Sequence, residues 1–183
     1  MKTTRSRLVK PLLAALMLGL LLVGVAACGS GNPREVEEGE VVTVGKLEYT
    51  VVFSRYLNEN DEEDVAYLAG QKPITDEHNY FGVFLQVFNP NHSSFNVVPH
   101  LTITDAEGNR YTALPSESEY AFPFGSVLTE NEPIPANDSS AQSDGTQGAV
   151  AIFELPEEVS ANRPLILHIK GPVNEEGRVK LDL

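Results

Sequence analysis

Apolar and polar residues alternate with a period of two over most of the chain after residue 40. Alternation of this kind places every second side chain on one face of an extended strand, where it can be buried. The pattern predicts seven or eight short strands, at residues 41–44, 47–54, 81–88, 101–104, 110–112, 148–155, 165–170 and 179–183. Residues 81–88, FGVFLQVF, are apolar on both faces, which is typical of a central strand in a sheet.

Turn-forming residues separate these segments, and no segment has the period of a convincing amphipathic helix. Asn89-Pro90 ends one predicted strand, and Pro156 ends another. Repeated short strands with turns between them predict an all-β fold, an antiparallel β-sandwich over residues 41–183. The residues expected in its core include Val51, Phe53, Val83, Leu85, Val87, Leu101, Ile103, Val150, Ile152, Leu165 and Leu167. If a strand is shifted by one residue, its expected core residues move to the opposite face of the sheet.

Two long segments interrupt the strand pattern. Residues 58–80 form an acidic connection, and residues 115–147 form another that is rich in Ser, Glu, Pro and Asn. Long irregular loops in a compact domain are usually functional or mobile. Their position on a rigid scaffold favours a binding function carried by these loops.

The N-terminal 27 residues have the organisation of an export signal. Residues 1–10 are basic, residues 11–27 are uncharged and almost wholly apolar, and small residues precede Cys28. The apolar run has 17 residues, the lower limit for a membrane-spanning helix, so its length alone leaves that alternative open. The order of the three parts favours a signal peptide over residues 1–27.

Cys28 lies where a lipid anchor requires a thiol. Val25-Ala26-Ala27-Cys28 resembles the bacterial lipobox, an aliphatic residue and two small residues before the cysteine. The resemblance implies that the Cys28 sulfur is alkylated by diacylglycerol, which would tie the protein to a bacterial membrane on the periplasmic or outer side. An ordinary secreted protein that begins at Cys28 is the alternative. Residues 28–40, which contain GSGNPREVEEGE, are predicted to be a flexible tether.

Charge and cysteine content exclude several classes of protein. The chain has 13 Lys and Arg against 26 Asp and Glu, a formal net charge of −13. An acidic body is a poor match for a phosphate backbone, so we expect no nucleic-acid partner. Cys28 is the only cysteine, which excludes an intrachain disulfide and a cysteine-based zinc cluster.

Three segments together resemble an immunoglobulin-like domain of bacterial lipoproteins and secreted proteins. They are the strand at residues 84–89, residues 101–111 with their Asp–Gly turn and Tyr111, and the closing strand at residues 148–156. The resembling group includes the mycobacterial immunoprotective extracellular antigen family and is largely of unknown function. The resemblance covers roughly residues 41–170, implies an immunoglobulin-like sandwich, and implies no catalytic residue.

Candidate metal ligands lie in the first long loop. Asp61, Glu62 and Asp64 could supply oxygen ligands to Ca²⁺, with His78 further along the same loop. The run lacks the turn glycine and the closing glutamate of a calcium-binding loop, so a solvated acidic loop is the alternative. The four histidines have none of the spacings typical of zinc sites.

Candidate ligand-binding residues lie in the second long loop. Tyr120, Phe122 and Phe124 are two apart, so their rings point to one side if the segment is extended. Such rings either fill the core or form an exposed strip for a sugar, a peptide or an apolar ligand.

We therefore expect an exported, lipid-anchored envelope protein that is a non-catalytic binding module. Its partners would be the membrane, through lipid on Cys28, and a protein, glycan or small-molecule ligand. No nucleophile motif or phosphate-binding glycine loop is present, so we expect neither enzyme activity nor a cofactor. The alternatives are a structural envelope protein without a specific ligand and a cation-dependent module that uses the acidic loop 58–64.

Overall fold

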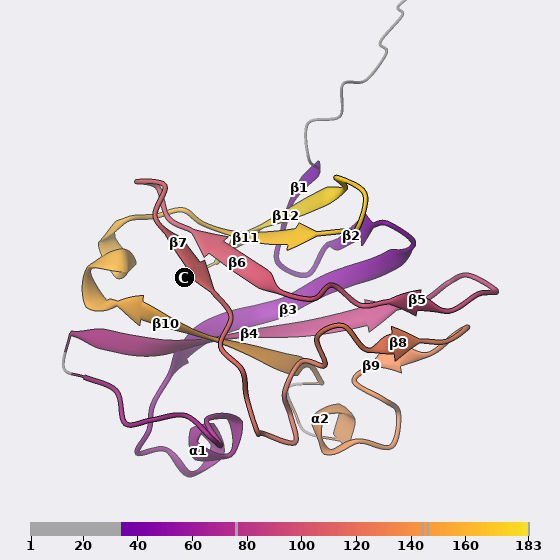
Figure 1. Cartoon of the computed structure of the whole chain (residues 1–183). Helices are drawn as coiled ribbons and strands as arrows, with labels where there is room; N and C mark the ends of the chain where they lie inside the picture. Colours follow the sequence, from indigo (N-terminus) through magenta and orange to yellow (C-terminus); the bar gives the residue numbers. More distant parts are fainter. Residues whose placement is uncertain (1–33, 76, 144, 146, 183) are drawn as a thin grey trace, which may run out of the picture. The chain divides into compact units, whose positions relative to one another are not determined.

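The computed structural model describes residues 34–75, 77–143, 145 and 147–182 (Figure 1). The predicted signal peptide, Cys28 and the first part of the predicted tether lie outside these residues. The described chain forms two packed sheets, which we call sheet A and sheet B. Sheet A has the strand order β1 (Arg34–Glu37), β12 (Glu176–Leu181), β11 (Leu165–Lys170), β6 (Leu101–Thr104) and β7 (Arg110–Thr112). Sheet B has the order β10 (Ala149–Pro156), β4 (His78–Phe88), β3 (Leu47–Leu57) and β2 (Val41–Val44), and β9 (Pro133–Ile134) also pairs with β4.

Smaller elements lie around the two sheets. They are the two-stranded sheet of β5 (Phe95–Asn96) and β8 (Val127–Leu128), the helices α1 (Glu62–Tyr67) and α2 (Ser140–Ser143), and the 3₁₀ helix η1 (Glu157–Ala161). The strand pairs of both large sheets are antiparallel apart from β1 and β12, which are parallel. The predicted all-β antiparallel sandwich is therefore confirmed.

The sandwich begins earlier in the chain than the sequence pattern indicated. Residues 34–37 form β1, and Val36 is buried opposite Val179 of β12. Glu38 accepts a hydrogen bond from the Ser54 hydroxyl at 2.5 Å, so it also belongs to the folded body. A single buried apolar residue among charged neighbours produces no period, which is why the sequence predicts a tether up to residue 40.

The main core lies between the two sheets. Eight of the predicted core residues are fully buried there, namely Val51, Val83, Leu85, Val87, Leu101, Ile103, Leu165 and Leu167. Alternate residues of β10, such as Ala151 and Phe153, also point into this core. Val150 and Ile152 are buried as predicted, but in a second cluster on the other face of β10.

The second cluster lies on the other face of sheet B. A β-bulge between Val51 and Phe53 shifts the register of β3 against β4 and turns Phe53 to that face. There Phe53 stacks on Phe84 of β4 with ring centroids 4.4 Å apart. Sheet B thus buries side chains on both faces, which explains why residues 81–88 are apolar throughout.

The first long loop provides the cover for this second cluster. Tyr67 and Leu68, at the end of α1, are buried in the cluster together with Tyr80 and Phe84. A helix of six residues is too short to produce a recognisable 3.6-residue period, so the sequence predicts an irregular segment over residues 58–80. The segment of α1 and Leu68 forms a lid over this part of sheet B.

The second long loop covers the free edge of β10. The N–H of Leu114 donates to the carbonyl of Ile152 at 2.7 Å, and the N–H of Phe122 donates to the carbonyl of Val150 at 2.8 Å. The rest of that loop carries β8, β9 and α2 around the end of β4 (Figure 1). Both long loops are therefore built into the body of the protein.

Candidate functional site

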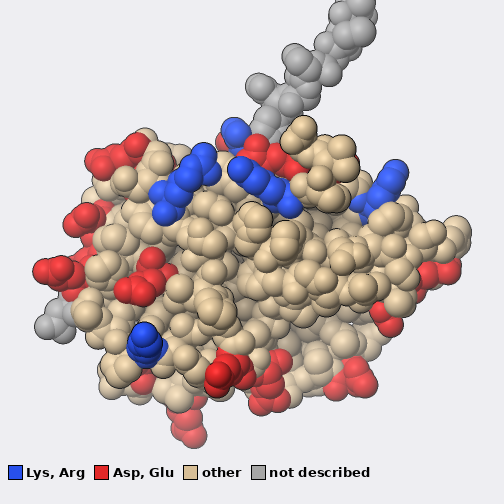
Figure 2. All heavy atoms as spheres, in the orientation of Figure 1, with Lys and Arg blue, Asp and Glu red and all other residues tan. Residues whose placement is uncertain are grey.

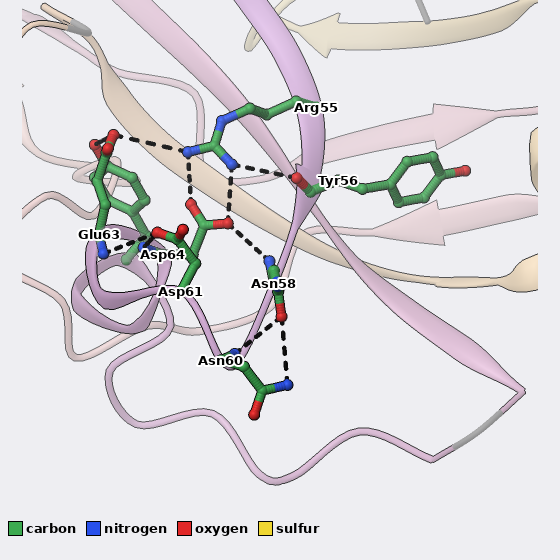
Figure 3. Close-up of polar contacts among 8 residues, drawn as sticks. Arg55, Tyr56, Asn58, Asn60, Asp61, Glu63 and Asp64 are labelled. Carbon is green, nitrogen blue, oxygen red and sulfur yellow. Dashed lines mark hydrogen bonds and ion pairs between the residues drawn. The ribbon is translucent and has the colours of Figure 1, made fainter.

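The predicted metal ligands are engaged in a structural network at the start of α1 (Figure 3). Asp61 is the N-cap of the helix, and its carboxylate accepts hydrogen bonds from the N–H groups of Glu63 and Asp64 at 3.0 and 3.4 Å. Asp64 is 3% exposed and accepts two bonds from the Arg55 guanidinium, at 2.9 and 2.5 Å. This pair raises the pKa of Arg55 further above its usual value. The acidic run therefore caps the helix and fixes it to β3.

The remaining candidate ligands do not converge on these two carboxylates. Glu62 is exposed on the first turn of α1, and His78 lies at the start of β4, where its Nδ1 is 3.2 Å from the Thr75 hydroxyl. Within the described residues, no group of three or more His, Cys, Asp and Glu side chains is placed to hold a metal ion.

The three candidate aromatic rings are divided between the two clusters. Phe122 is 3% exposed in the main core, and Phe124 packs edge to face against it with ring centroids 5.0 Å apart. Tyr120 packs edge to face on Tyr67 in the second cluster, at 5.1 Å. The rings therefore do not form one continuous exposed strip.

Tyr120 does meet two of the acidic residues at the surface. It lines an open hollow of about 530 Å³ together with Asp61 and Glu62. Tyr67 also lines this hollow, which is open to solvent.

A better-formed groove lies in the second long loop. It has a volume of about 450 Å³ and is lined by residues between Glu119 and Ala141 and by Ala149 of β10. Ile134 and Leu128, which belong to the main core, form part of its lining, so the groove is open directly above packed structure. Val127 is 59% exposed on the same lining. Such a surface can bury the apolar part of a ligand without unfolding any element.

Prolines give the groove a rigid wall. Pro123, Pro133 and Pro135 all line it. Proline has a fixed φ and no backbone N–H, so it offers an apolar ring and loses little conformational freedom when a ligand binds. Pro133 lies in β9, which pairs with β4 of sheet B. Because proline has no backbone N–H, this residue cannot donate a hydrogen bond to a further strand.

The charged side chains of the groove are all acidic. Glu119, Glu132 and Asp138 line it, and the described lining contains no Lys or Arg. Glu119 accepts a hydrogen bond from the Ser140 hydroxyl at 2.6 Å. Glu132 accepts one from the N–H of Thr129 at 2.9 Å, and this bond and one from the Thr129 side chain hold its pKa below the usual value. The groove therefore combines apolar proline rings with three carboxyl side chains.

A second hollow of about 290 Å³ adjoins the groove across β9. Pro133 and Ile134 line both hollows, and the second extends over the outer face of sheet B to Val41 and Phe88. Val41 and Phe88 are 47% and 39% exposed. The region around β9 thus has an unusual share of exposed apolar side chains.

Sequence reasoning pointed to the loop that carries the groove, and it left open whether the aromatic rings of that loop fill the core or form an exposed strip. Tyr120, Phe122 and Phe124 point into packed clusters, whereas Ala121 and Pro123 between them line the groove.

Comparison with known proteins shows the fold. No known protein-family profile matches the chain, and no curated protein matches it. An uncharacterised β-sandwich protein of Clostridium difficile is 17% identical with a TM-score of 0.51, over 84% of this chain and 97% of that one. The yjhA protein of Bacillus subtilis is 14% identical with a TM-score of 0.53, over 80% of this chain and 99% of that one.

The third similar structure bears on the sequence resemblance. The secreted protein MPT63 of Mycobacterium tuberculosis is 12% identical with a TM-score of 0.52, over 84% of this chain and the whole of that one. The resemblance to the immunoglobulin-like group that includes the mycobacterial antigens is thereby confirmed for the fold. At these identities the similarity extends to the fold alone. In the described part of the chain, no helix is long and apolar enough to cross a membrane.

Proposed function

We propose that the chain is an exported protein, anchored to a bacterial membrane by lipid on Cys28, and that its sandwich binds a ligand non-catalytically in the groove at residues 119–141. The groove is the observation that carries the binding function. It is built on packed core, walled by prolines and open to solvent. The lipobox-like residues before Cys28 carry the anchoring.

The lining of the groove indicates the chemistry of its ligand. An apolar wall favours a ligand with an apolar body, and three carboxylates without a neighbouring Lys or Arg favour a positive charge on it. An extended peptide segment with apolar and basic side chains has both properties. A cationic ligand would also be concentrated around a body that has nine Lys and Arg against 26 Asp and Glu.

Metabolic labelling tests the anchoring. The wild-type protein should incorporate labelled palmitate and float with membranes, whereas Cys28→Ala should do neither, because the sulfur is the site of alkylation. Two or more acyl chains are needed for firm anchoring, so loss of the site should release the protein completely. A Cys28→Ala protein that still incorporates label and stays with membranes would contradict a lipid anchor at this residue.

Site-specific cross-linking tests the groove. Benzoylphenylalanine replaces either Val127, which is 59% exposed in the groove, or Val65, which is 52% exposed on α1. Irradiation of intact cells should give an adduct of defined mass at position 127 and not at position 65. Equal labelling at both positions, or none at either, would favour the structural envelope protein without a specific ligand.

A charge reversal in each region serves as a matched control. Asp138→Lys places a positive charge in the groove, and Glu62→Lys makes the same change on the exposed surface of α1. If the ligand is basic, Asp138→Lys should reduce the adduct at position 127 and Glu62→Lys should leave it unchanged. An adduct that resists both changes would mean that charge does not select the ligand.

A further inference from the structure

The outer faces of the two sheets differ in what covers them. Part of the outer face of sheet B is covered by α1 and by the segment around Tyr120, which enclose the second cluster, whereas Val41 and Phe88 lie exposed on the rest of that face. The outward side chains of β1, β12, β11, β6 and β7, which we call the sheet A face, are exposed or half-buried apart from His168, which is 7% exposed. The sheet A face is therefore a broad, open surface.

This face is unusually rich in positive charge for so acidic a protein. Its charged side chains are Glu35, Glu37, Arg110, Lys170, Glu176, Arg178 and Lys180. It thus has four of the nine Lys and Arg that follow residue 33, but only three of the 26 Asp and Glu. The basic side chains visible in Figure 2 lie mostly in its upper half, where Figure 1 places sheet A, and acidic side chains dominate the lower half.

Contacts within the face neutralise two of its three carboxylates. Glu176 accepts from His168 at 2.7 Å and from Arg178 at 3.3 Å, and His168 also bonds to Thr104 at 2.7 Å. Lys180 lies 3.2 Å from Glu37. Lys170 and Arg110 are exposed and form no ion pair with the described residues. These two cations are therefore available to an external anion.

The proposed anchor is attached to the edge of the same sheet. The first described residue, Arg34, begins β1, which pairs with β12 at the edge of sheet A. Six residue steps separate Cys28 from Arg34, and a fully extended chain spans at most about 3.3–3.6 Å per residue. The start of β1 would then lie within about 20 Å of the lipid surface, close enough for surface charge to orient the body at low salt.

We propose that the sheet A face lies against anionic lipid headgroups, so that the groove beside β9 is directed away from the membrane. The inference rests on the proposed lipid anchor at Cys28. Anionic lipids repel the acidic side chains around α1 and attract Lys170 and Arg110, so a tethered body turns its basic face to the bilayer. The groove belongs to the sheet B side, because β9 pairs with β4, and that side remains accessible to a ligand.

The test uses the full-length lipidated protein in vesicles and a matched pair of new thiols. Thr112 and Thr43 are both exposed, at outward positions of β7 in sheet A and β2 in sheet B. Thr112→Cys and Thr43→Cys each provide one free thiol, since the Cys28 sulfur carries the lipid. The rate of reaction with a polyethylene-glycol maleimide is measured in phosphatidylcholine vesicles with and without phosphatidylglycerol.

We expect phosphatidylglycerol to slow the reaction at position 112 about fivefold, the effect of one net cation near an anionic leaflet, and to leave position 43 unchanged. High salt should remove the protection, because it screens the surface charge. Lys170→Glu should abolish the protection at position 112, whereas Lys72→Glu, the same change at an exposed residue beyond α1, should preserve it.

Flotation of the vesicles separates failure of this inference from failure of the anchor. A protein that floats but shows equal rates at positions 112 and 43 overturns the orientation alone. A protein that does not float contradicts the lipid anchor and with it the orientation that depends on it. Protection at position 43 instead of position 112 would mean that the sheet B side faces the membrane.

Discussion

At the scale of single residues, two of the four polar groups that the sequence offered as metal ligands, Asp61 and Asp64, hold the fold. Asp64 shows this most clearly, because it is buried and accepts bonds from the Arg55 guanidinium and from the N–H of Asn58 at 2.7 Å. Buried carboxylates are stable only when such partners satisfy them. A cluster of acidic residues in a sequence can therefore be a metal site or a set of structural carboxylates. Only the folded position of a nearby basic side chain such as Arg55 decides between the two.

Removal of the Asp64 carboxylate should destabilise the protein. Asp64→Ala leaves the Arg55 guanidinium and the Asn58 N–H without their acceptor. We expect a loss of about 2–3 kcal/mol in the free energy of unfolding. This is at the low end for a buried ion pair, because Arg55 is partly exposed. Urea denaturation measures the loss. Glu62→Ala, on the exposed side of the same helix, should change stability by less than about 0.5 kcal/mol. Equal midpoints for both variants would show that the pair contributes nothing.

Asp105 should make stability depend on pH. Burial raises its pKa, but hydrogen bonds from Asn109, Tyr111 and the N–H of Glu107 outweigh burial and hold the pKa below its usual value. A carboxyl with a depressed pKa in the folded state contributes stability at neutral pH and loses that contribution as pH falls through the folded pKa.

Asp105→Asn isolates this contribution. The variant should be less stable than the wild type at neutral pH, and the difference should shrink as pH falls below the ordinary aspartate pKa and through the lowered pKa of Asp105 in the folded state. Urea denaturation at neutral pH and at about pH 3 measures both differences. The exposed Asp138→Asn change is the control. A stability difference for Asp105→Asn that is the same at both pH values would contradict a depressed pKa.

At the scale of elements, the hydrophobic pattern predicted the features that arise from periodicity and missed those that depend on contacts between distant segments. The strands at residues 81–88 and 101–104 are present, because their apolar residues repeat with the period of a strand. The bulge after Val51 and the pairing of β1 with β12 have no local signal, since each is decided by a partner strand. The groove could not be predicted for the same reason: its wall is formed by prolines that only folding brings together.

The second cluster should contribute substantially to stability. Tyr67 is 1% exposed and packs edge to face against both Phe84 and Tyr120. Tyr67→Ala removes a buried ring, and we expect a loss of about 3–5 kcal/mol in the free energy of unfolding. Tyr120→Ala, at the half-buried partner, should cost less. If thermal unfolding shows the reverse order, the lid formed by α1 is only loosely packed on sheet B.

At the scale of the whole molecule, the acidic side chains are distributed and the basic ones are concentrated. The sheet A face has four of the nine Lys and Arg that follow residue 33, while acidic residues surround α1 and the groove. The distribution agrees with a body that is repelled from anionic surfaces on one side only. The acidic side chains are also spread out at short range: among the described residues, no three His, Cys, Asp or Glu side chains are placed to hold a metal ion.

Added salt should stabilise the protein without regard to which cation is supplied. The folded body has nine Lys and Arg against 26 Asp and Glu and therefore repels itself, and counterions screen that repulsion, so NaCl should raise the melting midpoint. A cation that binds a specific site in the native state raises the midpoint further, in proportion to the logarithm of its concentration above Kd. We expect CaCl₂ and NaCl at equal ionic strength to give the same midpoint by calorimetry, because Asp61 and Asp64 already bond to the backbone of α1 and to Arg55. A larger increase with CaCl₂, lost in Glu62→Gln, would instead support the cation-dependent module at residues 58–64.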